Sequence, residues 1–232
     1  MSPDKTSPSS RPSTRERVLD AAERLLASGH AGFSMRDLAS AAALSFATPF
    51  NQFGSKGAIM LALSARRIDA MEERLNRAPS VGTAAASVLA AVDIAASVML
   101  EAPSVNRIVM GTIGSPGDAP GDALSRSRDL WSLALGEGAG LADATRDLAL
   151  ATLPDHLALA FRGALSFWTA GEYDDRALRR SARSAAAACL LGFVGDADRP
   201  GLLACLEMSS ETDVEPCPAT TSSPTLDPPP TS

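Results

Sequence analysis

The sequence predicts an all-α protein in which a small N-terminal three-helix unit precedes a larger helical domain. Three observations support this prediction. Strand-type alternation of polar and apolar residues is nearly absent between the two termini. Alanine and leucine, which lose little side-chain freedom in helices, are plentiful, while aromatic residues make up only 4% of the chain. Serine residues that suit N-caps stand in front of apolar stretches with helical spacing.

The first predicted helix begins at a capping box. Ser13 and Glu16 have the S-x-x-E spacing, in which each side chain accepts a hydrogen bond from a backbone N–H that the helix start leaves free. The apolar residues that follow fall on one stripe: Val18, Ala22, Leu25 and Leu26. Gly29 then suits the left-handed conformation that ends many helices. This pattern predicts one helix of medium length.

Two short helices and a long one are predicted next. Ser34 and Asp37 form a second capping box. Ser45 and Ser55 are the third and fourth N-cap candidates, and Ser55 starts a helix over about residues 56–76. The two short helices are too brief to be stable alone. They must therefore pack on the first helix, and the predicted core residues are Phe33, Leu38, Leu44 and Phe53.

The helices of the larger domain follow from apolar stripes and from the Pro and Gly residues between them. One helix is expected over about residues 82–101, and Pro103 ends it. A short segment with Val105, Ile108 and Met110 comes next, and GTIGSPGDAPGD, residues 111–122, is predicted as a loop.

Three more helices complete this domain before a short terminal one. The first carries Leu124, Trp131 and Leu135. The second begins at Thr152, with Asp155 as its capping partner. After the turn GEYDD, the last long helix covers about residues 176–194, and a short helix holds Leu202, Leu203 and Leu206.

Charge is distributed unevenly along the chain. The whole chain has a formal net charge of −6, but residues 1–77 carry +3 and residues 78–232 carry −9. The start of the chain is therefore mildly basic. The Ser- and Pro-rich ends, residues 1–12 and 209–232, have the composition of disordered tails.

Several classes of protein have no support in the sequence. The three cysteines, Cys189, Cys205 and Cys217, have no CxxC spacing, and the two histidines lie far apart, so we predict no metal and no cofactor. This cysteine usage favours a reducing compartment, and neither a signal peptide nor a membrane-spanning segment is recognisable. We therefore expect a cytoplasmic protein.

The N-terminal helices carry a resemblance to a known family. Residues 34–42 and 45–52 have the lengths of the two helices of a helix-turn-helix, whose second helix enters the major groove of DNA. The stretch TRERVLDAAERLLASGHAGFSMRDLASAAALSFATPFNQFGSKGAI, residues 14–59, resembles the N-terminal domain of TetR family bacterial transcriptional regulators. The resemblance implies a helix-turn-helix DNA-binding domain over residues 13–57 and a helical ligand-binding and dimerisation domain over residues 58–208.

The resemblance also implies which residues contact double-stranded operator DNA. They come from the start of the second helix, from the third helix and from the start of the fourth: Arg36, Ser45, Phe46, Ala47, Thr48, Phe50, Asn51, Gln52 and Lys56. A helix N-terminus attracts phosphate, and Arg36 can contact guanine or phosphate. Lys56 is expected to grip a phosphate, and Phe50 suits either the core or a DNA-facing surface.

Four positions depart from the family pattern. Ala43 stands at a turn position that is usually glycine, Phe50 replaces a tyrosine, and Gly57 replaces an acidic residue. Pro49 lies inside the third helix. If Ser45 is the N-cap, Pro49 is the fourth helical residue, and the cap carbonyl loses its donor.

For the larger domain the resemblance implies a pocket for a small-molecule effector and a homodimer interface. Candidate pocket residues, for which plain core packing is the alternative, are Met99, Arg107, Met110, Trp131, Phe161 and Trp168. The last two long helices, with the stretches LALAFRGALSFW and SARSAAAACLLGF, are expected to form the dimer.

The predicted function is that of a ligand-responsive, sequence-specific repressor. An activator, or a regulator controlled by a protein partner, is the alternative on the same fold. A helical enzyme is a third possibility from another class, but the sequence has no His/Cys/Asp cluster, no GxSxG and no glycine-rich phosphate loop. No catalytic residue is predicted.

Overall fold

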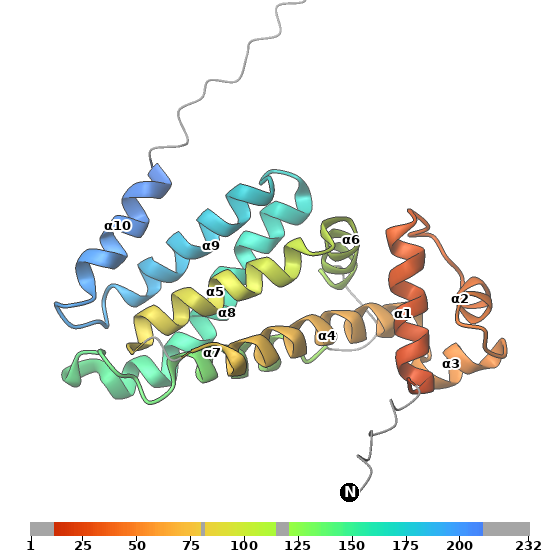
Figure 1. Cartoon of the computed structure of the whole chain (residues 1–232), viewed down its shortest axis with the longest axis horizontal. Helices are drawn as coiled ribbons and strands as arrows, with labels where there is room; N and C mark the ends of the chain where they lie inside the picture. Colours follow the sequence, from red (N-terminus) through yellow and green to blue (C-terminus); the bar gives the residue numbers. More distant parts are fainter. Residues whose placement is uncertain (1–11, 80–81, 115–120, 211–232) are drawn as a thin grey trace, which may run out of the picture.

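The computed structural model describes residues 12–79, 82–114 and 121–210 and confirms the all-α prediction (Figure 1). Over these ranges the chain forms α-helices, one 3₁₀ turn, η1, and no strand; an isolated bridge joins Leu141 to Val194. The helices are α1 (Thr14–Ala27), α2 (Met35–Ala41), α3 (Ala47–Phe53), α4 (Lys56–Arg77), α5 (Ala84–Leu100), α6 (Pro103–Ile113), α7 (Ala123–Leu135), α8 (Arg146–Ala170), α9 (Asp175–Leu190) and α10 (Arg199–Ser210), with η1 at Asp143–Thr145.

The molecule is elongated, and α1, α2 and α3 lie together at one end of it (Figure 1). Helix α4 leads from this end along the larger helical domain, which α5 to α10 complete. The predicted boundary between residues 57 and 58 falls within the first turn of α4. Residues Ile59 and Leu63 of α4 pack with α1 and α2, together with Val105 and Val109 of α6. The N-terminal helices are thus fixed to the larger domain through α4 and α6.

The first two predicted capping boxes are confirmed. Ser13 and Glu16 exchange both of their side-chain-to-backbone hydrogen bonds, and Ser34 and Asp37 do the same. The backbone N–H of Ser34, followed by its hydroxyl, holds the pKa of Asp37 below the usual value. The stability that this lowered pKa provides is present above the ordinary carboxyl pKa and is lost as the pH falls through the lower folded value.

The predicted start of the eighth helix is wrong. Helix α8 begins at Arg146, so Thr152 lies inside it, and the Thr152 hydroxyl donates to the carbonyl of Leu148 at 2.8 Å. A threonine hydroxyl can be satisfied within a helix in this way, so the T-x-x-D pattern does not require a cap. Pro154 is tolerated in the helix interior.

Other predicted boundaries need smaller corrections. Pro103 does end the preceding helix, since it opens α6 after a bend of 101°. The first residues of the predicted 111–122 loop complete α6, and residues 115–120 of it lie outside the described ranges. Helix α9 ends at Leu190, before the predicted residue 194. The predicted tails also lie outside the described ranges, apart from Pro12 and from residues 209–210, which belong to α10.

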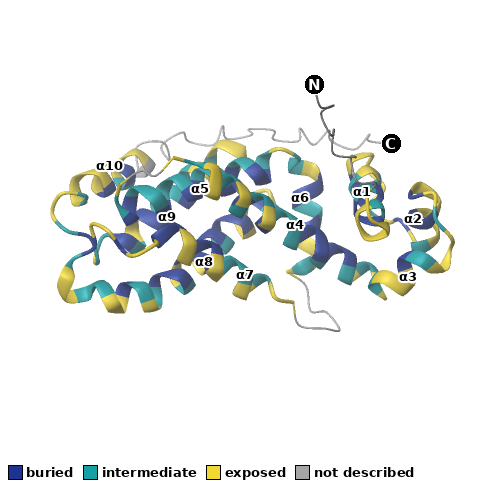
Figure 2. Ribbon diagram, turned by 60° about the horizontal axis from the view of Figure 1, so that its bottom comes forward, coloured by how far each residue is buried: buried dark blue, intermediate teal, exposed yellow. Residues whose placement is uncertain are grey.

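The core of the larger domain lies between the inner faces of its helices, where buried residues gather in Figure 2. Its largest side chains are Trp131 of α7 and Trp168 of α8, both fully buried. Phe161 contacts Trp131 edge to face, with ring centroids 5.6 Å apart. Aromatic burial of this kind dominates the energy of a core.

Within the described ranges no single helix is long and apolar enough to cross a membrane. Helices α5 and α6 reach that length and apolarity only when taken together, and they are bent by 101° relative to each other.

Candidate nucleic-acid interface

The turn between α2 and α3 is a Schellman motif that fixes the angle between the two helices. The N–H of Leu44 donates to the carbonyl of Ala39, and the N–H of Ala43 donates to that of Ser40. Ala43 takes the left-handed conformation, with φ at +52°, and is the one non-glycine residue in the described part of the chain with a positive φ. Arg17 of α1 donates to the carbonyls of Ala42 and Ala43, both at 2.9 Å, and so holds the turn on α1.

Ala43→Gly is expected to raise the free energy of unfolding by about 0.5–1 kcal/mol. Glycine removes the left-handed penalty of roughly 1–2 kcal/mol, and the greater freedom of the unfolded chain offsets part of that gain. Urea unfolding measures the change. Ala41→Gly is the matched control, because Ala41 is in the last turn of α2 and glycine there should destabilise by about 0.5–1 kcal/mol. Equal changes in the free energy of unfolding for the two substitutions would contradict the claim that Ala43 is strained.

The predicted N-cap of the third helix lies one residue too early. Helix α3 starts at Ala47 with Phe46 at the cap position, and Ser45 makes no cap bond to the helix. The hydroxyl of Ser45 instead contacts that of Thr48 at 2.6 Å. Pro49 is therefore the third helical residue, whose N–H would be unpaired in any helix, so no helical hydrogen bond is lost. Its ring is buried and anchors the helix start.

Helix α3 presents two aromatic side chains to solvent. Phe46 is 60% exposed and Phe50 is 62% exposed, and their i, i+4 spacing puts them on one side of the helix. Phe50 is therefore a surface residue and not part of the core, and its contact with DNA stays a prediction. The guanidinium of Arg36 lies over the Phe46 ring at 5.2 Å. Both rings are thus largely exposed, and the Phe46 ring has Arg36 on one face.

The other predicted contact residues of α3 differ in how far they are exposed. Ala47, Asn51 and Gln52 are exposed, and Thr48 is half-buried. Arg36, from α2, is exposed beside them. The structure therefore brings the predicted residues of α2 and α3 to one end of the molecule, and their contact with DNA stays a prediction.

Lys56 differs from this exposed group. Its ammonium donates to the carbonyls of Ala31 and Phe33, the latter at 3.2 Å, and lies 4.3 Å from the centre of the Phe33 ring. Lys56 therefore joins the start of α4 to the turn that precedes α2. The predicted phosphate contact stays a prediction, and in this structure the charge is used within the protein.

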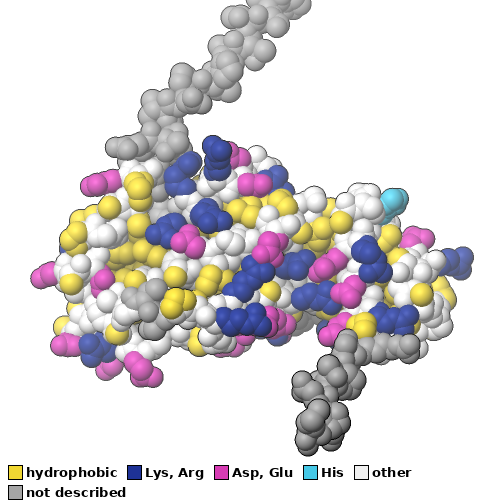
Figure 3. Space-filling model, in the orientation of Figure 1, with side chains coloured by type: hydrophobic (Ala, Val, Ile, Leu, Met, Phe, Trp, Pro, Cys, Tyr) yellow, Lys and Arg dark blue, Asp and Glu magenta, His cyan; other side chains and the backbone are white. Residues whose placement is uncertain are grey.

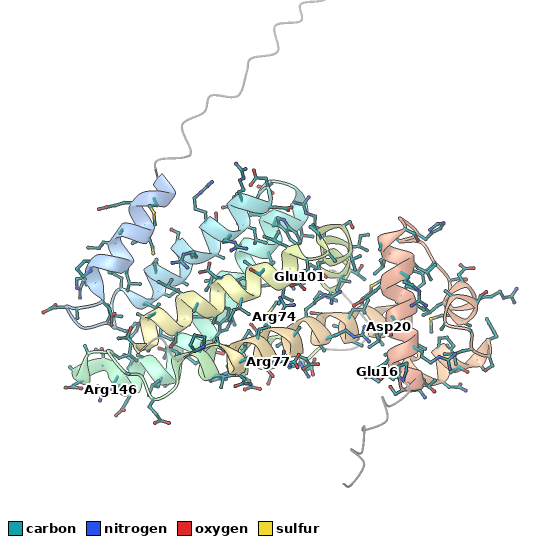
Figure 4. The ribbon with its side chains drawn as sticks, in the orientation of Figure 1. Glu16, Asp20, Arg74, Arg77, Glu101 and Arg146 are labelled. Atoms are coloured by element: carbon teal, nitrogen blue, oxygen red, sulfur yellow. The ribbon has the colours of Figure 1, made fainter. Side chains whose placement is uncertain are left out.

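Three ion pairs connect α4 to α1. Arg66 contacts Asp20 at 2.7 Å and Glu23 at 3.6 Å, and Arg67 contacts Glu23 at 2.7 Å. In Figure 3 the Lys and Arg side chains over α1 and α4 alternate with Asp and Glu, and in Figure 4 Asp20 lies on α1 where it faces α4. Arg67 also donates to the side-chain oxygen of Asn106, which is buried in α6.

The larger domain contains a cavity of about 510 Å³ along α4. Helices α5 to α8 supply the rest of its wall, which is mainly apolar. The volume is in the range of pockets that hold small molecules. The cavity reaches the first turn of α4, where Ser55, Gly57 and Ala58 line it on both sides of Lys56.

Half of the predicted pocket residues line this cavity. Met99, Met110 and Phe161 do so. Trp131 and Trp168 lie in the packed core, and each uses its ring N–H within the protein. The helical spacing of apolar residues could not separate a cavity wall from a packed core, because both occur on the inner face of a helix.

Arg107 does not line the cavity either. Its guanidinium pairs with Asp175 of α9 at 3.1 Å and covers the Trp168 ring at 4.7 Å. The sequence analysis missed Arg162 of α8, which does line the cavity. The signal that could have identified it is the single cation in the apolar stretch LALAFRGALSFW.

Comparison with known proteins agrees with this geometry. Residues 18–63 match the family model described as bacterial regulatory proteins, tetR family. A TetR transcriptional regulator from Rhodococcus sp. RHA1 has a similar structure, with a TM-score of 0.60 and 19% identity over 76% of this chain and 96% of that chain. The SmeT–triclosan complex aligns at a TM-score of 0.43 with 15% identity, over 79% of this chain and 92% of that chain. No curated protein matches the sequence significantly.

The helix-turn-helix at the N-terminus and the helical domain behind it define a class, the DNA-binding transcription regulators. Within that class, residues 18–63 match the tetR family of bacterial regulatory proteins, and the chain is similar in fold to a TetR transcriptional regulator.

Proposed function

We propose that the protein is a homodimeric repressor that binds operator DNA through α3 and releases it when a small-molecule effector occupies the cavity. The observation that carries this proposal is the exposed face of α3, held by the Schellman turn and by buried Pro49. Two large aromatic rings exposed on so short a helix are expected where the helix contacts a partner. Such a protein acts by binding DNA in the cytoplasm. It needs no catalytic residue.

The position of the cavity supports control by a ligand. Its wall includes residues on both sides of Lys56, and Lys56 holds the turn in front of α2. Arg67, also in the wall, pairs with Glu23 of α1. A molecule that moves the first turns of α4 therefore acts on the contacts that position α2 and α3. The ligand shifts the equilibrium between the DNA-binding and the released conformation. The size of the shift is set by the difference between its affinities for the two conformations.

The proposed dimer uses the outer faces of α8 and α9. Phe167 of α8 is 46% exposed, and small residues on α9, including Ser184 and Ala188, allow close approach of a second helix. A two-fold dimer presents two copies of α3 to successive major grooves, so its operator has two half-sites about 34–36 Å apart.

The test is a titration of DNA from upstream of the protein's own gene, followed by fluorescence anisotropy. We expect two chains per site and a steep loss of affinity with salt. Asn51→Ala should weaken the binding free energy by about 1–3 kcal/mol through the loss of one base contact in each half-site, because an asparagine side chain can hydrogen-bond to the edge of an adenine. Asn76→Ala, an equivalent change in the exposed last turn of α4, is the control. Equal binding of specific and random DNA would contradict the proposal.

A further inference from the structure

The charge of the cavity wall is unbalanced. Two arginines line the cavity, and the described residues of its wall include no Asp or Glu. Arg67 is already neutralised by Glu23 and bonded to Asn106. Arg162 has no carboxylate partner in the described part of the chain, and its one contact there within hydrogen-bonding range is the sulfur of Met110 at 3.8 Å.

A guanidinium in this environment is poorly satisfied. It has five N–H donors, and a thioether sulfur is a weak acceptor. Burial lowers the pKa of Arg162 below the usual arginine value, which records the cost of taking the cation out of water. Gly114 lies beside it, and a Cβ at that position would be 3.5 Å from Nη2, an ordinary van der Waals distance.

A second feature lies beside Arg162. A smaller space of about 290 Å³ shares Met110, Arg162 and Leu165 with the large cavity and is also lined by Thr169. Thr169 follows Arg162 by seven residues and is therefore on the same face of α8. Its hydroxyl oxygen is buried and has no hydrogen-bond partner in the described part of the chain. A charged donor and an unpaired hydroxyl thus border one space, which shares three wall residues with the apolar cavity.

We propose that the effector is an apolar small molecule with one anionic group. The oxygen atoms of that group accept hydrogen bonds from the guanidinium of Arg162 and the hydroxyl of Thr169. The apolar part lies in the larger cavity, against the side chains of Met99, Met110 and Phe161. That the occupant controls DNA binding rests on the proposed function, whereas the binding site itself does not.

Isothermal titration calorimetry of the full chain tests the chemical class with matched probes. Sodium octanoate is compared with 1-octanol, and 2-naphthoate with 2-naphthol at a pH where the naphthol is neutral. In at least one pair the carboxylate should bind about 10- to 100-fold more tightly, the ratio expected for hydrogen bonds to a charged group. Equal affinities in both pairs, or no binding of any probe, would overturn the proposal.

Three variants assign the preference to its residues. Arg162→Met should abolish the preference for the carboxylate and leave binding of the neutral probe unchanged. Thr169→Val, which keeps the side-chain shape, should weaken binding of the carboxylate probe by a few-fold and leave binding of the neutral probe unchanged. Arg67→Met should keep the preference, because Arg67 is paired in the free protein. A preference that survives in Arg162→Met, or that disappears only in Arg67→Met, contradicts the assignment.

Anisotropy with operator DNA, recorded on the same samples, separates the two proposals. Binding of the carboxylate without release of DNA would refute the regulatory function and leave the site standing. Release of DNA by the neutral probe as readily as by the carboxylate would refute the anionic class and leave the regulatory function standing.

Discussion

Lys56→Met is expected to destabilise the protein by about 1–3 kcal/mol and to weaken binding to all DNA sequences alike. The ammonium of Lys56 bonds the carbonyls of Ala31 and Phe33, and methionine keeps the apolar stem but provides no donor. The turn before α2 then loses its attachment to α4, and the pair α2–α3 loses its fixed position. Thermal unfolding gives the stability, and anisotropy at several salt concentrations gives the affinity.

The salt dependence distinguishes this structural role from a phosphate contact. A lysine that neutralises a phosphate contributes about one unit to the slope of log affinity against log salt concentration. Because the ammonium of Lys56 is turned towards the protein, we expect the slope to change by less than one. Arg77→Met, at the far end of α4, removes an equal charge and is the control. An unchanged melting temperature together with a slope reduced by one would contradict the structural role and support a phosphate contact for Lys56.

Leu38→Ala is expected to have the largest effect on stability, a loss of about 2–5 kcal/mol. Leu38 is fully buried in the cluster that joins α1, α2 and the first turns of α4. Helix α2 has seven residues and cannot persist without such contacts. DNA affinity should fall with stability, because α3 is positioned by α2 through the Schellman turn. Chemical unfolding followed by circular dichroism provides the measurement.

The matched control for Leu38 is Leu133→Ala in α7. Leu133 is 45% exposed, so the same truncation removes little buried area and should change stability by less than about 1 kcal/mol. If Leu38→Ala unfolds at the same denaturant concentration as wild type, the packing of α2 described here is wrong.

Local chemistry made much of the fold predictable. The capping boxes at Ser13 and Ser34 satisfy donors within four residues of themselves, so their sequence pattern alone decides whether they form. The break at Pro103 follows from its missing N–H. The pattern failed at Thr152, where the hydroxyl had two possible partners and the helix extended past it.

The candidate site was predictable only where neighbours in sequence determine its geometry. The exposure of Phe46 and Phe50 follows from a short helix with one buried face, although the sequence could not show which face that was. The partners of Lys56 and Arg107 come from segments 23 to 68 residues away, so their bonds depend on the tertiary fold. The same is true of Arg162, whose lack of a carboxylate partner among the described residues is a property of the packed cavity rather than of its neighbours in the chain.

The three ion pairs between α4 and α1 would set a limit on how sharply the proposed effector can act. Each is partly exposed, and such a pair contributes about 1 kcal/mol or less. Breaking all three would change the ratio of DNA-binding to released chains by roughly 150-fold at most, whereas a shift from 1:99 to 99:1 needs about 10⁴-fold. An effector that worked through these pairs alone would therefore tune gene expression in a graded way, and an all-or-none response would need further contacts along α4.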